Sequence, residues 1–141
     1  MFNGRSAEIR YAKATVHSMP GVILFPDSYI HPNGVNAPAN TNTAAAPFDG
    51  NVYDGDDWAA MESAGCVFLP ASGDRRYNGA SNAQVQQVYY VGTTGYYWST
   101  TYDSSTAARS LMFNNTNLNV NKSNSSNRNR GRCVRLVRDV N

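Results

Sequence analysis

The sequence predicts a mixed α+β fold, made mostly of short antiparallel strands with one or two short helices and long irregular loops. Runs rich in β-branched and aromatic residues alternate with Gly, Pro and Asn clusters, which is typical of short strands joined by turns. One acidic segment has the capping pattern of a helix. The chain has 141 residues, of which 41% are hydrophobic, and this is the size of one ordinary core. We therefore expect a single domain over residues 1–141.

The first two elements are a hairpin and a loop. Residues 9–25 carry β-branched and aromatic residues on both sides of a Ser-Met-Pro-Gly turn at 18–21, which predicts two short paired strands. Residues 31–51 hold several Pro, Gly and Asn residues without hydrophobic periodicity. They predict a long irregular excursion that contributes nothing to the core.

A short helix follows within residues 54–65. Asp56 or Asp57 is expected to cap it, negative charge lies at its N-terminal end, and Gly65 is placed to end it. Trp58 and Met61 would then share one face. A calcium loop is the alternative for these acidic residues, but no bidentate Glu follows at the required offset, so capping is favoured.

The second half of the chain predicts further short strands. Residues 66–70 form one, residues 71–82 are rich in turn-forming residues, and residues 84–102 suit an antiparallel hairpin with Gly92 or Gly95 in its turn. Shorter apolar runs predict the remaining strands, at residues 110–113, 118–120 and 133–137.

The formal net charge of +2 is unevenly distributed. Acidic residues cluster at Asp54, Asp56 and Asp57, and arginines crowd the end of the chain, at Arg128, Arg130, Arg132, Arg135 and Arg138. Such an arginine group suggests phosphate binding. The alternation of Arg135 and Arg138 with apolar neighbours favours the solvated side of a terminal strand instead, so no nucleic-acid partner is expected.

Cys66 and Cys133 are far apart in the sequence, and both have strand-forming neighbours. A long-range disulfide and two separate thiols, with Cys66 buried as a small hydrophobe, both remain open. No apolar run approaches the roughly 20 residues that a membrane span needs, so no membrane insertion is expected. No signal peptide is recognised, which fits a cytoplasmic protein, a phage protein or a domain of a longer secreted chain.

Residues 114–129 are about half asparagine. Disorder is one interpretation. Leu118 and Val120 punctuate the segment at a spacing of two, however, which favours an ordered ribbon that turns asparagine outward. Asparagine both donates and accepts hydrogen bonds, and tyrosine adds flat contact area at low entropic cost, so this chemistry is typical of a binding surface.

Three segments, residues 64–75, 95–113 and 129–137, resemble in this order the C-terminal half of bacterial surface proteins with a FISUMP-type domain. That family, the formylglycine-generating-enzyme-like domains and the variable proteins of diversity-generating retroelements are similar to one another in having a C-type-lectin-like fold. The resemblance implies this fold here. It also implies an extracellular location, on a bacterial cell surface or a phage particle, and an oligomer within a larger assembly is compatible with it.

The resemblance to retroelement variable proteins implies a hypervariable display region at about residues 95–138 that binds a protein or a cell-surface ligand. The scaffold would include Trp98, Ser99, Leu111, Phe113, Gly131, Val134 and Val137. The predicted display residues are Tyr97, Thr101, Tyr102, Asp103, Arg109, Asn114, Asn117, Asn119, Asn121, Asn127, Arg128, Asn129 and Arg132.

Other function classes are not favoured. The calcium-binding tripeptides of sugar-binding C-type lectins do not occur, the two lone cysteines are not the close pair of an oxidase, and His17 and His31 have no recognisable nucleophile partner. The sequence therefore predicts no catalytic residue, no metal and no cofactor. The alternative to ligand display is a fixed adhesion or structural role, as in a fimbrial tip, a lipoprotein or a phage fibre.

Overall fold

The computed structural model describes residues 9–77, 86–119, 126–127 and 130–135. The fold is of the α+β class, with short strands in three small sheets and one α-helix in the described part. The chain divides into two compact units, Met1–Pro70 and Ala71–Asn141. That residues 1–141 form a single domain stays a prediction.

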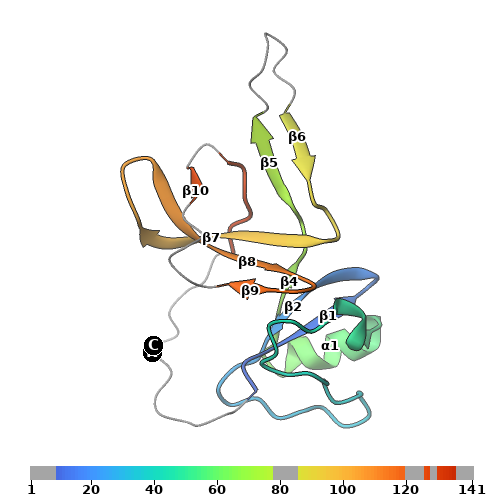
Figure 1. Cartoon of the computed structure of the whole chain (residues 1–141). Coiled ribbons are helices and arrows are strands. Elements are labelled where there is room, and N and C mark those ends of the chain that lie inside the picture. The colour runs from blue at the N-terminus through green and yellow to red at the C-terminus, as the bar shows by residue number, and fades with distance from the viewer. Residues whose placement is uncertain (1–8, 78–85, 120–125, 128–129, 136–141) are drawn as a thin grey trace. The chain divides into compact units, whose positions relative to one another are not determined.

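The first unit is built on a four-stranded sheet in the order β3-β1-β2-β4. Its strands are β1 (Tyr11–Val16), β2 (Met19–Leu24), β3 (Val52–Tyr53) and β4 (Val67–Pro70), and β1 pairs with β3 in parallel and with β2 in antiparallel (Figure 1). The predicted hairpin is confirmed, but its turn is His17–Ser18, and residues 19–21 belong to β2. Both turn residues have positive φ, 49° and 64°, as in the type I′ turns that match strand twist.

Helix α1 (Gly55–Ser63) is also confirmed, with a different cap. The Asp54 carboxylate accepts hydrogen bonds from the backbone N–H groups of Asp56 and Asp57, both at 3.0 Å. Met61 is fully buried, and Trp58 packs on the same core with its ring 5.8 Å from that of Phe68. The acidic residues at the start of the helix are therefore explained by capping.

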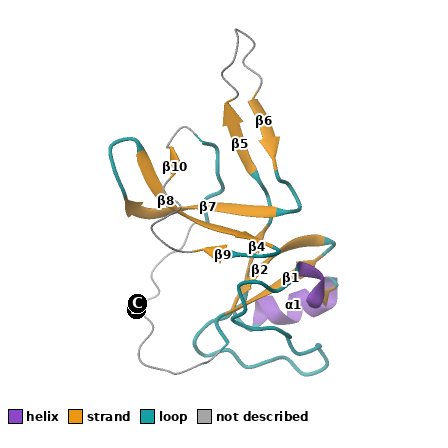
Figure 2. Ribbon diagram, viewed as in Figure 1, coloured by secondary structure: helices purple, strands orange, loops and turns teal. Residues whose placement is uncertain are grey.

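The loop between β2 and α1 contributes to the core, contrary to the prediction. It is the long teal segment of Figure 2, and it contains the short 3₁₀ helix η1 (Phe48–Gly50). Ala46 and Phe48 are buried, and Asn51 hydrogen-bonds the backbone of Ala39 and of Lys13. The loop thereby covers the side of β1 that carries Lys13, a burial that hydrophobic periodicity does not reveal.

The described residues of the second unit form two sheets. The strands are β5 (Asp74–Tyr77), β6 (Gln86–Tyr89), β7 (Thr94–Tyr102), β8 (Ala107–Asn114), β9 (Leu118–Asn119) and β10 (Ser126–Asn127). One sheet has the order β10-β8-β7, with β9 also on β8, and the other pairs β5 with β6.

This pairing corrects the predicted hairpin over residues 84–102. Strand β6 pairs with β5, which lies in the segment predicted to be turns, and β7 pairs with β8. Gly92, at φ 74°, does lie in a turn, but that turn connects two different sheets, and Gly95 is inside β7. The predicted strand at 133–137 is reduced to a single bridge at Cys133, and residues 136–137 lie outside the described part.

Residues 131–133 connect the two sheets of the second unit. Gly131 exchanges backbone hydrogen bonds with Arg75 of β5, at 2.7 and 2.9 Å. Cys133 does so with β7, accepting from Trp98 N–H at 2.9 Å and donating to the Tyr96 carbonyl at 3.1 Å. The backbone of Arg132, the residue between them, is therefore held between β5 and β7.

Candidate functional site

The β7–β8 hairpin has one buried side. Tyr97 is 7% exposed and Phe113 is fully buried, and their rings stack at 6.1 Å between centroids. Burial raises the pKa of Tyr97 to about 12. Tyr97 was predicted on the display surface, and this placement is wrong, because the alternation of β7 turns it into the core.

The end of this hairpin where β7 turns into β8 is irregular and exposed. Trp98 pairs with Ser110 and Tyr102 with Ala108, so three residues of β7 lie opposite one residue of β8. This β-bulge pushes Ser99–Thr101 outward. An open groove of about 350 Å³ is lined by Trp98, residues 99–102 and Ala108. The predicted display residues Thr101 and Tyr102 line it, and Tyr102 is 67% exposed.

Two predicted display residues near this groove, Asp103 and Arg109, contact each other within the hairpin. Asp103 and Arg109 form an ion pair at 3.5 Å, with side chains 23% and 30% exposed. The Ser104 hydroxyl accepts a hydrogen bond from the backbone N–H of Ala107 and closes the tip. The Asp103 and Arg109 side chains therefore fix the shape of the tip and present only part of their surface.

Asn114 has a local structural role. Its Oδ1 accepts hydrogen bonds from the backbone N–H groups of Thr116 and Asn117, at 3.0 and 2.9 Å, which makes an Asx-type turn at the end of β8. Asn117 is exposed. Asn119 and Asn127 lie in β9 and β10, with side chains outside the described part, and Asn121, Arg128 and Asn129 lie wholly outside it.

Two residues predicted as scaffold are instead on the surface. Ser99 lies in the exposed bulge, and Val134 is 63% exposed. Leu111 and Trp98 are half-buried, and Val137 is outside the described residues.

Arg132, the last predicted display residue, lies over two aromatic rings. Its guanidinium carbon is 4.7 Å from the ring centroid of Tyr96 and 5.0 Å from that of Trp98, which share one face of β7. Its Nη1 donates to the Ser110 hydroxyl on β8. Burial lowers the pKa of this guanidinium below its ordinary value. Arg132 is thus held in place, half-buried and desolvated.

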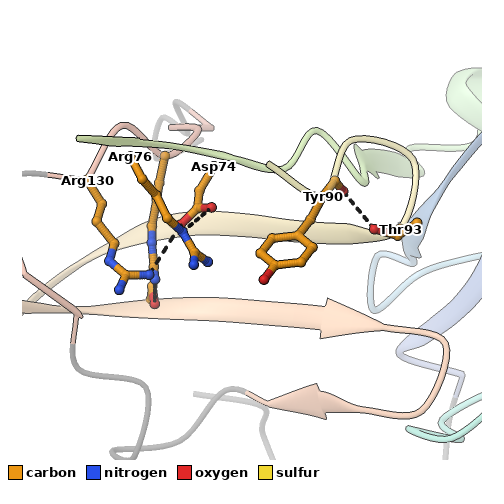
Figure 3. A network of polar contacts seen from close by, with 7 residues as sticks. Asp74, Arg76, Tyr90, Thr93 and Arg130 are labelled. Atoms are coloured by element: carbon orange, nitrogen blue, oxygen red, sulfur yellow. Dashed lines mark hydrogen bonds and ion pairs between the residues drawn. The ribbon is translucent and has the colours of Figure 1, made fainter. Parts of the chain in front are cut away.

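A second arginine site lies close to it in the same unit. Arg76 Nε donates to both carboxylate oxygens of Asp74, at 2.9 and 3.0 Å, and Arg130 Nη1 lies 3.4 Å from Asp74 Oδ2. The Asp74 side chain is fully buried, whereas the two arginines are about a third exposed. Figure 3 shows both guanidinium groups converging on this carboxylate, with the Tyr90 ring beside them.

Tyrosine rings connect the two arginine sites. Arg76 lies 5.0 Å from the ring centroid of Tyr90, and the Tyr90 ring is 6.5 Å from that of Tyr96, on which Arg132 stacks. We call this set the arginine–tyrosine cluster. Its members are Asp74, Arg76, Tyr90, Tyr96, Arg130 and Arg132.

Of this cluster, the sequence predicts only Arg132 to lie on a binding surface. Asp74 and Arg76 lay in a segment predicted to be turns, so their shared side of a strand was not recognised. Their spacing of two residues was the available signal, because alternate residues of a strand face the same way.

A second groove, of about 330 Å³, adjoins the cluster. It is lined by residues 72–75, Val88 and residues 131–133, so both Asp74 and Arg132 contribute to its wall. The Ser72 hydroxyl and the Cys133 thiol lie 2.9 Å apart there.

Other chemistry-bearing side chains have structural partners. Cys66 and Cys133 are free thiols, and burial raises the pKa of Cys66 to about 11. His31 bonds the Tyr29 hydroxyl and the Val35 carbonyl. Among the described residues no group of three or more His, Cys, Asp or Glu side chains is placed to hold a metal ion. No helix of the described part is long and apolar enough to cross a membrane.

The fold is of the α+β class, and its second unit carries a bulged, exposed hairpin end and an arginine–tyrosine cluster. A family model described as a domain of unknown function, DUF8237, matches residues 52–137. The chain belongs to this family. The matched region begins at β3 and includes α1, β4 and all the described strands of the second unit. No curated protein and no solved structure matches the chain.

Proposed function

We propose that this chain is a non-catalytic ligand-display domain of the C-type-lectin-like class, with a surface diversified by a retroelement. The display surface is centred on the exposed end of the β7–β8 hairpin, and Tyr97 is not part of it. Its ligand is a protein or a cell-surface molecule, reached in an extracellular setting.

The single observation that carries the proposal is the division of β7 into two parts. Its first half is anchored by buried residues, Thr94, Gly95 and Tyr97, whereas four consecutive residues, 99–102, are exposed around a bulge and line a groove. A core strand that continues into an irregular exposed segment suits ligand display, because a rigid scaffold then positions side chains that the core does not constrain. Hydroxyl and tyrosine side chains there match the chemistry of adaptable binding surfaces.

A randomisation experiment tests this division. Codons 99–102 are fully randomised in one library and codons 110–113 of the paired strand in a second, and the folded fraction of each is measured by protease resistance on displayed particles. Ser110 and Phe113 are buried, so the second library is expected to lose most folded members, whereas the first keeps them. Equal losses would mean that the hairpin end is a structural element and not a display surface.

Sequencing the DNA around the gene tests the origin of the diversity. A near-copy of codons 95–138 beside a reverse-transcriptase gene, differing chiefly at adenines, is the expected result. Its absence, together with intolerance of the randomised hairpin end, would favour a fixed adhesion or structural domain.

A further inference from the structure

The two-stranded sheet of β5 and β6 has one covered edge and one open edge. On β5, Arg75 exchanges backbone hydrogen bonds with Gly131, at 2.7 and 2.9 Å, so that edge is occupied. On the other side, β6 has no strand partner except β5 among the described residues (Figure 1). The outer edge of β6 is thus unpaired in the described part of the chain, and an unpaired edge is a template for another strand.

The register shows which backbone groups lie on this open edge. Antiparallel strands alternate between residue pairs that exchange hydrogen bonds and pairs that do not. Arg75 gives its backbone N–H and C=O to Gly131, so it does not bond Val88, the residue opposite it on β6. The backbone N–H and C=O of Val88 therefore point to the open edge, and by the same alternation so do those of Gln86. Gln87, between them, turns its own groups to β5.

The open edge lacks the features that protect most strand edges. Natural edge strands carry lysine, proline or a bulge that prevents pairing with another chain. Strand β6 is in regular register with β5, and its residues 86–89 include no charged residue and no proline. Val88 is 46% exposed, and just after the strand Tyr90 and Val91 are 50% and 57% exposed. An uncharged, partly apolar edge of this kind favours the addition of a further strand.

The residues of β6 are complementary to a second copy of themselves. In an antiparallel pair with its two-fold axis at Gln87, this residue lies opposite itself, and Gln86 lies opposite Val88 of the second copy. The outward backbone groups of Gln86 and Val88 then bond each other across the pair, with none left over. The two Gln87 carboxamides meet at the axis, and a carboxamide both donates to and accepts from another. A charge at the axis would instead lie opposite the same charge.

From this edge we propose that two copies of the chain associate by antiparallel pairing of their β6 strands. A strand of 4 residues buries much less surface than a standard interface, so the association is weak, with a dissociation constant in the micromolar to millimolar range. The pairing itself does not depend on ligand display. Under the proposed display function, it doubles the number of display surfaces and raises the avidity for a repeated ligand.

A foreign peptide is a poorer match to this edge. Peptides that add a strand to a sheet gain specificity from pockets that receive alternate side chains. The groove of about 330 Å³ in this unit is lined mainly by residues 72–75 and 131–133, and Val88 alone of β6 reaches it. Residues 131–133 lie on the covered edge of β5, so this groove does not run along the open edge of β6.

Sedimentation equilibrium of the full chain over a range of concentrations tests the proposal. We expect the average mass to rise with concentration towards that of a dimer. Backbone amide hydrogen exchange locates the contact: exchange at Val88 should slow as the concentration rises, whereas Tyr89, whose N–H faces β5, should exchange slowly throughout. A monomer that persists into the millimolar range, or association without protection of Val88, would overturn the proposal.

A charge at Gln87 tests the two-fold axis. Gln87→Glu keeps the size of the side chain and places like charges opposite each other in the dimer, whereas within each copy the new carboxylate lies across from Arg76 and should not weaken the fold. We expect at least about tenfold weaker self-association. The control is Asn33→Asp, the same change from amide to acid at an exposed position of the first unit, and it should leave association unchanged. Equal effects would show only general charge repulsion and contradict the proposal.

Mixing oppositely charged variants extends this test. Gln87→Lys alone should also associate weakly, but an equimolar mixture with Gln87→Glu should form mixed dimers in native mass spectrometry, because opposite charges then meet at the axis. A mixture that stays monomeric would argue against this register and reject the proposed pairing.

A further variant covers the case in which the charged variants fail to fold. Val88→Pro removes an N–H that β5 does not use, and proline is tolerated in an edge strand when this side faces outward. It should abolish the concentration dependence of the mass while the thermal midpoint of the dilute chain stays near that of the parent. Association that persists in Val88→Pro would place the contact elsewhere on the molecule and refute the proposal.

Discussion

Lys13 provides a sharp test of the first unit, because a lysine is fully buried there. The residue has no exposed surface, its Nζ donates to the Ala44 carbonyl, and the Phe48 ring centroid is 5.7 Å away. Burial lowers the pKa of Lys13 from 10.5 to about 8. The folded state therefore holds this proton less tightly than the unfolded state does.

The sign of the pH dependence follows from this difference. Below about pH 8 both states are protonated, and the cost of burying the charge is fully present. Between about pH 8 and 10.5 the unfolded chain keeps a proton that the folded chain has lost, so the contribution of Lys13 to stability rises with pH. At roughly 1.4 kcal/mol per pKa unit, the whole rise is at most about 3.5 kcal/mol.

Lys13→Met isolates this contribution. The variant removes the charge but leaves the Ala44 carbonyl without this donor, a loss of roughly 1–3 kcal/mol that does not depend on pH. We expect the difference in free energy of unfolding, parent chain minus variant, to increase by up to about 3 kcal/mol as the pH rises from 8 to 10.5.

Urea denaturation of both chains at a series of pH values measures the difference. Tyr53, Tyr97 and Cys66 are present in both proteins, so their contributions cancel when the two curves are subtracted. Burial raises the pKa of Tyr53 to about 12, for example, which lowers the stability of both chains at high pH. Parallel curves from pH 7 to 10 would refute the reasoning, because they would show that the Lys13 pKa is the same in both states.

Two further outcomes are expected. Gly95→Ala places a Cβ 2.1 Å from the Phe113 ring, so we expect a loss of about 1–3 kcal/mol in thermal or urea unfolding. Gly50→Ala, whose Cβ meets nothing nearer than 3.5 Å, is the control, and equal losses would mean that the Gly95 contact is not tight. Brief alkylation at pH 8 should modify Cys133 before Cys66, because Cys66 is 3% exposed and burial raises its pKa to about 11. Equal labelling by mass spectrometry would contradict this placement.

The local sequence determined those elements whose backbone hydrogen bonds join residues close together in the chain. Helix α1 and the β1–β2 hairpin follow from capping and turn-forming residues that are neighbours in the chain. Even there, the position of the cap and of the turn shifted by two or more residues, because several adjacent residues satisfy the same pattern. The α+β class follows from the same local signals.

Strand pairing and side-chain direction depended on distant residues. Strand β6 pairs with β5 rather than with β7, although β7 is nearer in sequence and equally rich in strand-forming residues. Tyr97 and Trp98 are both aromatic, and only the packing of β7 on Phe113 decides that Tyr97 is inside. A one-residue change of register exchanges the two faces of a strand, and the resemblance that implied a display role for Tyr97 did not fix this register.

The arginine–tyrosine cluster was decided by tertiary structure alone. The sequence by itself determined that the chain is built mostly of short strands, with one or two short helices and an end rich in arginine. It did not determine that Arg132 lies on Tyr96 and Trp98, or that Arg76 and Arg130 share Asp74. These partners are brought together by the backbone bonds of residues 131–133 to β5 and β7. Such contacts form only when segments far apart in the chain meet, and no local pattern encodes which segments those are.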